Sequence, residues 1–224
     1  MQQTIRILMT DDHPMIIEGY QNTLIATKKE KQDLIIDIAN SCDESIKYME
    51  KAVSLNNPYD ILFMDISLPP SSDGKYTSGE DLAKYARTIM PKAKIVILTM
   101  FNEAYRIHNI VKTIDPEGFL IKSDLTSKEL ASAFQAVMSN PPFYSGSVNS
   151  MIRKSISSDI VVDEINRKIL HLLSQGIKTK SLTDYINLSM SAIEKRKKHL
   201  KELFMIEDGS DETLLEEARK KGFV

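Results

Sequence analysis

Five polar residues that could do chemistry stand directly after four short apolar runs of the sequence. They are Asp11 and Asp12 after residues 5–9, Asp65 after residues 60–64, Thr99 after residues 94–98, and Lys122 after residues 118–121. Runs of this kind are typical of parallel strands that are covered on both faces, and ligands of such sheets bind beyond the carboxyl ends of the strands. If the four runs pair in one sheet, three carboxylates, a hydroxyl and an ammonium share one cleft.

This set of groups is suited to accepting a phosphoryl group with the help of Mg²⁺. A carboxylate can act as the nucleophile and form an acyl phosphate, while cations neutralise the charge on the phosphoryl oxygens. Mg²⁺ prefers octahedral oxygen ligation and commonly takes one or two protein carboxylates. Asp11 and Asp12 cannot both stay ionised at low cost beside Asp65 unless a divalent cation offsets their charge.

The elements that must position these residues alternate between strand and helix patterns. We predict five strands, at residues 5–9, 34–38, 60–64, 94–98 and 118–121, each followed by a helix. The helices begin at His13-Pro14 and at Ser41, and the later ones cover residues 80–90, 103–113 and 127–138. Repeated units of this type imply a parallel sheet with right-handed crossovers, which is an α/β doubly wound fold.

The pattern changes after residue 138. Ser139-Asn140-Pro141-Pro142 cannot continue a helix, and the serine-rich stretch that follows predicts a linker over residues 139–159, with a helical turn or more near residues 148–154. Residues 160–224 have no strand pattern. Their apolar spacing predicts a small all-α domain of four short helices: one that ends near Gly176, one over residues 179–186, one over residues 191–204 and one over residues 211–221.

Composition places few limits on function. Hydrophobic residues at 42% and charged residues at 27% are ordinary for a globular protein, and residues 151–224 hold 14 basic against 12 acidic side chains, which does not identify a nucleic-acid partner. The single cysteine, Cys42, excludes an internal disulfide and fits a reducing compartment. With no signal peptide and no apolar stretch of about 18 residues, we expect a cytoplasmic protein with no membrane partner.

Four motifs in this order and spacing resemble the receiver domain of two-component response regulators. They are Asp11-Asp12-His13-Pro14, Met64-Asp65-Ile66-Ser67-Leu68-Pro69, Leu98-Thr99 and Leu120-Ile121-Lys122-Ser123. The resemblance covers roughly residues 4–138. It implies a (βα)5 flavodoxin-like receiver over residues 1–138 that takes its phosphoryl group from a sensor histidine kinase. It also implies that the chain is not an enzyme, apart from slow loss of its own phosphoryl group.

The same resemblance implies roles for the acidic residues of the cleft. Asp65 is implied as the phosphoacceptor. Asp12, Asp65 and the backbone carbonyl of Ser67 are implied as direct Mg²⁺ ligands, and Asp11 is implied to act mainly through a bound water. Taken alone, a carboxylate at a strand end is more often a helix cap or a solvated loop charge.

Three further positions complete the implied site. Thr99 and Lys122 are implied to bind the phosphoryl oxygens, and Phe119 stands at the position of an aromatic switch that follows the movement of Thr99. Taken alone, they would be interpreted as a structural hydroxyl, a surface charge and a core ring. Met100 and Phe101 are interpreted as packing and switching residues.

One departure from the receiver pattern is a long loop at residues 70–78, between the motif around Asp65 and the next helix. This loop flanks the acceptor. It is either a tolerated surface insertion or a segment that covers the acyl phosphate or contacts the kinase.

Residues 160–224 resemble the LuxR/NarL-type helix-turn-helix output domain. The matching stretches are residues 165–176, 181–186, 188–193 and 218–222. The resemblance implies a transcription regulator that binds double-stranded DNA and forms a homodimer when it is phosphorylated.

The helix at residues 191–204 is expected to be the recognition helix. At 100° per residue, Ile193, Leu200, Leu203 and Phe204 fall on one side and leave a basic face opposite. With the preceding turn, this face gives the predicted DNA contacts Lys178, Lys180, Lys195, Arg196, Lys198 and Lys201. The alternative is that this basic face only contacts solvent and binds no partner, because most runs of charged residues lie on solvated helix faces.

Two rival functions remain open. The first is a phosphorelay or protein-interaction regulator whose helical domain binds protein, which Glu194 and the acidic pair Glu207-Asp208 favour. The second is a phosphohydrolase of similar topology, which would need an Asp-x-Asp pair that Asp11-Asp12-His13 does not supply. His171 and His199 have no partners at metal-ligand spacing.

Overall fold

The computed structural model describes residues 3–100, 104–139, 141–157, 162–206 and 209–224, without the side chains of residues 154–157. The chain divides into two compact units, which are treated separately below. The first consists of Met1–Asn102 and Ile110–Val148, and the second of Glu103–Asn109 and Asn149–Val224.

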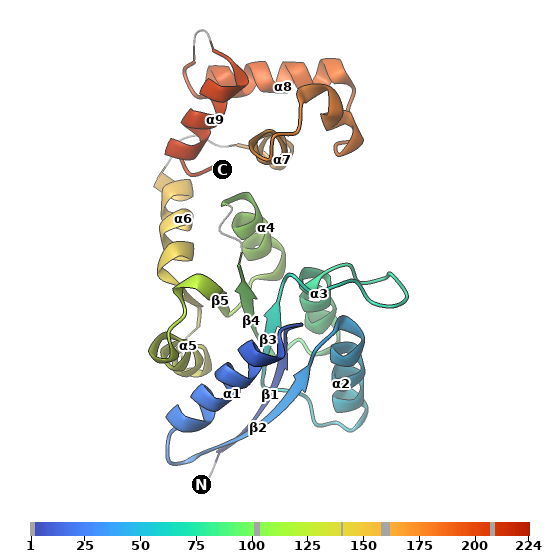
Figure 1. Cartoon of the computed structure of the whole chain (residues 1–224), viewed down its shortest axis with the longest axis vertical. Helices are drawn as coiled ribbons and strands as arrows, with labels where there is room; N and C mark the ends of the chain where they lie inside the picture. Colours follow the sequence, from blue (N-terminus) through green and yellow to red (C-terminus); the bar gives the residue numbers. More distant parts are fainter. Residues whose placement is uncertain (1–2, 101–103, 140, 158–161, 207–208) are drawn as a thin grey trace. The chain divides into compact units, whose positions relative to one another are not determined.

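The first unit contains a parallel sheet of six strands in the order β2-β1-β3-β4-β5-β6 (Figure 1). The strands are β1 (Gln3–Thr10), β2 (Gln32–Ala39), β3 (Ile61–Asp65), β4 (Lys94–Thr99), β5 (Gly118–Ile121) and β6 (Phe143–Tyr144). The predicted doubly wound fold and its five strands are therefore confirmed. The sixth strand lies in the segment predicted as a linker, and its two residues are too few to produce a period-2 pattern.

Helices cover both faces of this sheet (Figure 1). They are α1 (Pro14–Thr27), α2 (Cys42–Ser54), α3 (Gly79–Ile89), α4 (Ala104–Ile114), the short 3₁₀ helix η1 (Lys122–Asp124) and α5 (Ser127–Ser139). α1 packs against α5 on one side, and α2 packs against α3 on the other. The helix predicted to start at Glu103 begins at Ala104 in the described part of the chain.

The helix starts follow the local sequence. Proline occupies the first turn of α1, where its missing N–H is not needed. Ser41 caps α2 by accepting a hydrogen bond from the backbone N–H of Glu44, and the Glu44 carboxylate accepts one from the backbone N–H of Asn40. These caps fix where each helix leaves the end of the preceding strand.

Two of the inner strands, β3 and β5, are buried along their full length. The core cluster joins apolar side chains of the strands to those of α1 and α5. The edge strand β2 is only partly covered, and Ile35 is exposed at 45%. The continuous apolar runs therefore mark the strands that carry functional residues at their ends.

The second unit is helical in its described part after residue 149. Its elements are α6 (Gly146–Ser157), which starts in the first unit, α7 (Glu164–Ser174), the 3₁₀ helix η2 (Thr179–Asp184), α8 (Met190–Leu203) and α9 (Asp211–Lys220). Asp163, Ser189 and Ser210 cap α7, α8 and α9. The helix predicted over residues 179–186 is a 3₁₀ helix over Thr179–Asp184.

Apolar side chains from each of these elements except α6 form the core of the second unit. Ile193, Leu200 and Phe204 are buried in it as predicted, whereas Leu203 is half-buried. No helix among the described residues has both the length and the apolar character that crossing a membrane requires.

Gly79, the first residue of α3, lies close to the backbone at the end of β3. A Cβ atom at this position would lie 1.8 Å from the carbonyl oxygen of Asp65, so a side chain cannot fit without moving the backbone. The N–H of Gly79 donates to the carbonyl of Ile66 at 3.1 Å. The first residue of α3 is thus fixed against the peptide next to Asp65.

We expect Gly79→Ala to destabilise the first unit by about 1–3 kcal/mol, because the new methyl group clashes with a backbone atom. The matched control is Gly19→Ala in α1, where a Cβ would meet nothing within 4 Å. Since alanine has the higher helix propensity, this control should gain up to about 1 kcal/mol. Urea unfolding curves give both values, and equal stability of the two variants would contradict the close approach.

Candidate functional site

The ends of β1, β3, β4 and β5 lie at one edge of the sheet. Thr10 pairs with Met64, Asp65 with Leu98, and Thr99 with Ile121. The carboxyl ends of the four strands are therefore in register with one another. Asp11 and Asp12 follow β1, and Lys122 follows β5. The structure therefore brings together the five polar residues that the sequence analysis singled out.

Lys122 bridges two of the carboxylates. Its Nζ lies 2.5 Å from Oδ2 of Asp11 and 3.0 Å from Oδ2 of Asp65. The side chains of Lys122, Asp11 and Asp65 are exposed at only 4%, 1% and 1%. Because Asp12 adds a third, partly exposed carboxylate, the site has more negative charge than one ammonium can neutralise.

Burial raises the pKa of Asp65 above its ordinary value, although Lys122 acts in the opposite direction through a hydrogen bond and its charge. The negative charge of Asp11 raises it further, and a backbone hydrogen bond at Ser67 lowers it. The net shift is upward. Nearby, burial raises the pKa of Tyr20 to about 12, with smaller contributions from the charges of Asp11 and Asp65.

The donor set fits a hard divalent cation. Asp11, Asp12, His13 and Asp65 each offer a ligand atom, and these atoms lie within 4.8 Å of one another. Oδ1 of Asp65 is buried and has no hydrogen-bond partner among the described residues. A buried carboxylate oxygen without a donor is stabilised by a cation, and oxygen ligands suit Mg²⁺.

Thr99 and Phe119 are buried residues of the inner strands β4 and β5. Thr99 is the last residue of β4 and is fully buried. Phe119, on β5, is also fully buried and contacts Tyr144 of β6 edge to face, with the ring centroids 6.4 Å apart. Phe119 therefore occupies the inward position in this structure. Met100 is exposed at 62%, and Phe101 lies outside the described residues.

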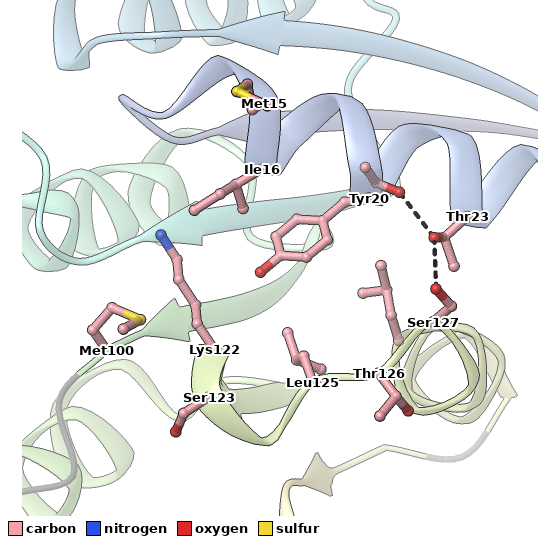
Figure 2. A pocket seen from close by; sticks show the side chains of 12 residues that line it. Met15, Ile16, Tyr20, Thr23, Met100, Lys122, Ser123, Leu125, Thr126 and Ser127 are labelled. Atoms are coloured by element: carbon pink, nitrogen blue, oxygen red, sulfur yellow. Dashed lines mark hydrogen bonds between the residues drawn. The ribbon is translucent and has the colours of Figure 1, made fainter.

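A cavity of about 400 Å³ opens beside Lys122, between α1 and α5 (Figure 2). Its lining is mainly apolar and includes Met15, Ile16 and Leu125, with the ring of Tyr20 between the two helices. At its far end, the hydroxyl of Thr23 donates to Ser127 at 3.5 Å. The sequence analysis did not anticipate this cavity, because α1 and α5 are distant in the chain.

The loop at residues 70–78 is anchored to both neighbouring helices. The backbone N–H and the hydroxyl of Ser72 both donate to Asp43 of α2 at 3.0 Å. The ring of Tyr76 lies 5.1 Å from that of Tyr85 in α3, and Thr77 donates to Asp81 of the same helix. These contacts give the insertion a defined conformation, and its role stays a prediction.

The predicted DNA contacts fall into two groups. Lys195 and Lys198 on α8 are exposed, as are Lys178 and Lys180 around the start of η2. Arg196 and Lys201, by contrast, have hydrogen-bond partners within the second unit. The exposed basic face is therefore smaller than predicted, and it also contains the exposed Glu194.

Long basic side chains of α8 tie this helix to its neighbours. Arg196 donates to the Asp163 carboxylate at 2.8 Å, and Lys201 donates to the carbonyl of Gly209 at 2.7 Å. Lys197 is only 6% exposed and donates to Thr179 at 2.7 Å and to Asp211 at 2.9 Å. Spacing along the helix cannot reveal these partners. The acidic pair Glu207-Asp208 lies outside the described residues.

Comparison with known proteins places this architecture in a class. The fold is that of response regulators that combine a receiver with a helical output domain. The solved structure of a complex between the response regulator RcsB and DNA is 22% identical, covers 97% of this chain and 99% of that one, and has a TM-score of 0.64. The isolated receiver of RcsB from Salmonella enterica is 25% identical over 66% of this chain and 98% of its own, with a TM-score of 0.55.

Relatives of known name agree with this class. The oxygen regulatory protein NreC of Staphylococcus haemolyticus is 22% identical over 97% of this chain and 98% of its own. The transcriptional regulatory protein RcsB of Escherichia coli K12 is 24% identical over 87% of this chain and 85% of its own. No family model matches the chain. The resemblance to a response regulator with a helix-turn-helix output domain is thus confirmed.

The raised pKa of Asp65 leads to a prediction about stability. Because the folded state binds this proton more tightly than the unfolded state, stability falls as pH rises from the unfolded pKa through the folded pKa. With divalent ions removed at neutral pH, Asp65→Asn should therefore be more stable than the native chain by on the order of 1 kcal/mol. Urea unfolding at several pH values measures this difference.

The difference should shrink towards about pH 4, where the carboxyl group of the native chain is protonated in the unfolded state as well. A variant that is less stable than the native chain at neutral pH would contradict the burial and crowding of this carboxylate.

Proposed function

We propose that this chain is a transcription regulator controlled by phosphorylation of Asp65. The observation that carries the proposal is the double contact of Lys122 with Asp11 and Asp65 at the ends of three strands. A buried lysine shared by two carboxylates is suited to holding the oxygens of an incoming phosphoryl group.

Asp65 supplies the nucleophile in this proposal. Its Oδ2, which Lys122 contacts, attacks phosphorus, while Oδ1, which has no hydrogen-bond partner in the described part of the chain, is left for a metal ion. As the new O–P bond forms, the bond between phosphorus and the donor histidine breaks, and the proton of the charged donor ring remains on the kinase. Lys122 then exchanges its carboxylate contact for a phosphoryl oxygen, and the Thr99 hydroxyl donates to another.

Asp11, Asp12, Asp65 and the backbone carbonyl of Ser67 are proposed to hold a Mg²⁺ ion. When bound, this ion neutralises charge on the phosphoryl oxygens during transfer. The buried, unsatisfied oxygen of Asp65 and the excess of carboxylates support its presence. In this proposal each chain accepts one phosphoryl group on Asp65 and catalyses no reaction of another substrate. Its only further chemistry is the slow loss of its own phosphoryl group.

The proposed partners are a sensor histidine kinase, double-stranded DNA and a second copy of the chain. Solved structures of RcsB show dimers of that protein bound to DNA, and they match this chain over both units. The exposed pairs Lys178–Lys180 and Lys195–Lys198 supply the positive surface that backbone phosphates require. A cytoplasmic location, with which the single Cys42 is consistent, belongs to the same proposal.

A protein-binding output domain is the alternative, and this chain favours it less. Glu194 supports that alternative because a carboxylate repels phosphate, although it could accept a hydrogen bond from a cytosine amino group. The full-length similarity to DNA-bound RcsB favours DNA.

We expect Asp65→Asn to abolish phosphorylation, because an amide is not a nucleophile at neutral pH. Mass spectrometry after incubation with acetyl phosphate and Mg²⁺ should detect one added phosphoryl group on the native chain and none on the variant. Asp60→Asn is the matched control, since Asp60 precedes the same strand and accepts a hydrogen bond from the backbone N–H of Arg6. Modification of Asp65→Asn, or none of the native chain, would overturn the proposal.

The basic face of α8 gives a second test. Replacing both Lys195 and Lys198 with alanine should weaken DNA binding similarly for different sequences and lower the slope of log affinity against log salt by about 2. Electrophoretic mobility shifts at several salt concentrations, with and without acetyl phosphate, measure this slope. The double variant of Lys47 and Lys51, exposed on α2, removes the same charge and should leave the slope unchanged. Equal slopes for the two double variants would contradict the assigned face.

A further inference from the structure

His13 lies within the group of carboxylates and has no part in the function proposed above. Its Nδ1 is 2.8 Å from Oδ1 of Asp12 and 3.2 Å from Oδ1 of Asp11. The ring is 62% exposed, so the inner nitrogen faces the carboxylates while much of the side chain meets solvent. Capping of α1 does not explain the position of the His13 ring, because this side chain makes no capping hydrogen bond to the helix that starts at Pro14.

These separations match those between neighbouring ligands of one octahedral ion. Metal–oxygen and metal–nitrogen bonds of about 2.1 Å, set at right angles, place adjacent ligand atoms about 3 Å apart. The distances from the His13 nitrogen to the two Oδ1 atoms thus match those from one ligand atom to two of its neighbours in a coordination octahedron. The ligand atoms of His13, Asp11, Asp12 and Asp65 all fall within 4.8 Å of one another.

A second observation indicates that this group is arranged for an ion. Oδ1 of Asp65 is buried, has no hydrogen-bond partner in the described residues, and belongs to a side chain that is 1% exposed. Lys122 contacts only the Oδ2 atoms of Asp65 and Asp11. Oδ1 of Asp65 therefore remains available for an ion, whereas Oδ1 of Asp11 accepts a hydrogen bond from the backbone N–H of His13 at 3.0 Å.

We propose that Nδ1 of His13 is a direct ligand of the divalent ion in this site. The inference rests on the proposed function, to which it adds a nitrogen ligand and a preference among ions. An imidazole nitrogen favours first-row transition metals, whereas an all-oxygen site suits Mg²⁺. His13 thus makes the site bind Mn²⁺ or Ni²⁺ more tightly, relative to Mg²⁺, than its carboxylates alone would.

Binding requires one tautomer of the ring. In the tautomer with its proton on Nδ1, the ring donates to Oδ1 of Asp11 at 3.2 Å. To donate its lone pair to a metal, Nδ1 must lose this proton, and the neutral ring then carries its proton on Nε2. The exposure of the ring allows Nε2–H to be solvated.

Pulsed electron paramagnetic resonance on the full-length chain loaded with Mn²⁺ tests this proposal directly. Modulation from a directly bound ¹⁴N nucleus is expected in the native chain and should be absent in His13→Ala. His199→Ala is the matched control, since His199 is an exposed histidine of α8 whose Nδ1 lies 3.8 Å from the Glu202 carboxylate. This control should keep the full ¹⁴N signal.

Calorimetric titration adds a readout of ion preference. Removing a group that only orients a metal ligand typically weakens metal affinity by about 10- to 100-fold, and removing a ligand should weaken it at least as much. The ratio of Ni²⁺ to Mg²⁺ affinity should therefore fall by on the order of tenfold in His13→Ala. His199→Ala should retain the native ratio. A native ratio in His13→Ala would overturn the proposal.

The outcomes separate this inference from the function on which it rests. If the native chain binds Mn²⁺ without a ¹⁴N signal and still accepts a phosphoryl group on Asp65, the role of His13 is wrong and the acceptor site stands. If no divalent ion binds and Asp65 is not modified, both proposals fail. A ¹⁴N signal that persists in His13→Ala also overturns the role of His13.

Discussion

The structure depends above all on one buried ammonium that lies between two buried carboxylates. Lys122 reaches Asp11 and Asp65 from a strand that is not adjacent to that of Asp11, so the contact holds only when β1, β3, β4 and β5 are in register. It connects residues 111 positions apart in the chain. The ion pair therefore forms only when the sheet is assembled, and it joins residues at the ends of three strands at the edge where the candidate site lies.

The uncompensated negative charge of this site lowers the stability of the fold. Burying an acidic group without full compensation disfavours its ionised form, and one ammonium cannot compensate Asp11, Asp12 and Asp65 together. The native fold tolerates this imbalance because the apolar core beneath the strands stabilises it. Such a pocket is well suited to bind a cation, which offsets the excess negative charge, and a phosphoryl group on Asp65 adds negative charge and so increases the need for that cation.

The sequence predicted the strands and the edge of the sheet well for a physical reason. A continuous apolar run indicates burial on both faces, and the first polar residue after it must lie at the strand end, as Asp65 and Lys122 do. Partners set by tertiary contact could not be predicted in this way. Arg196 and Lys197 have the same spacing as exposed residues of α8, yet Asp163 and Asp211 bind them. The number of basic residues on a helix therefore overstates the charge that it presents.

The contact between Gly79 and the carbonyl of Asp65 has a consequence for how this chain can vary over evolution. The turn after the acceptor is closed by a residue without a side chain, and the inserted loop is attached separately to α2 through Asp43. Insertions and deletions between Pro69 and Ser78 can therefore accumulate without moving the acceptor, whereas a substitution at Gly79 would be purged. Lineages of this protein should differ in the length of this segment and agree on the glycine that ends it.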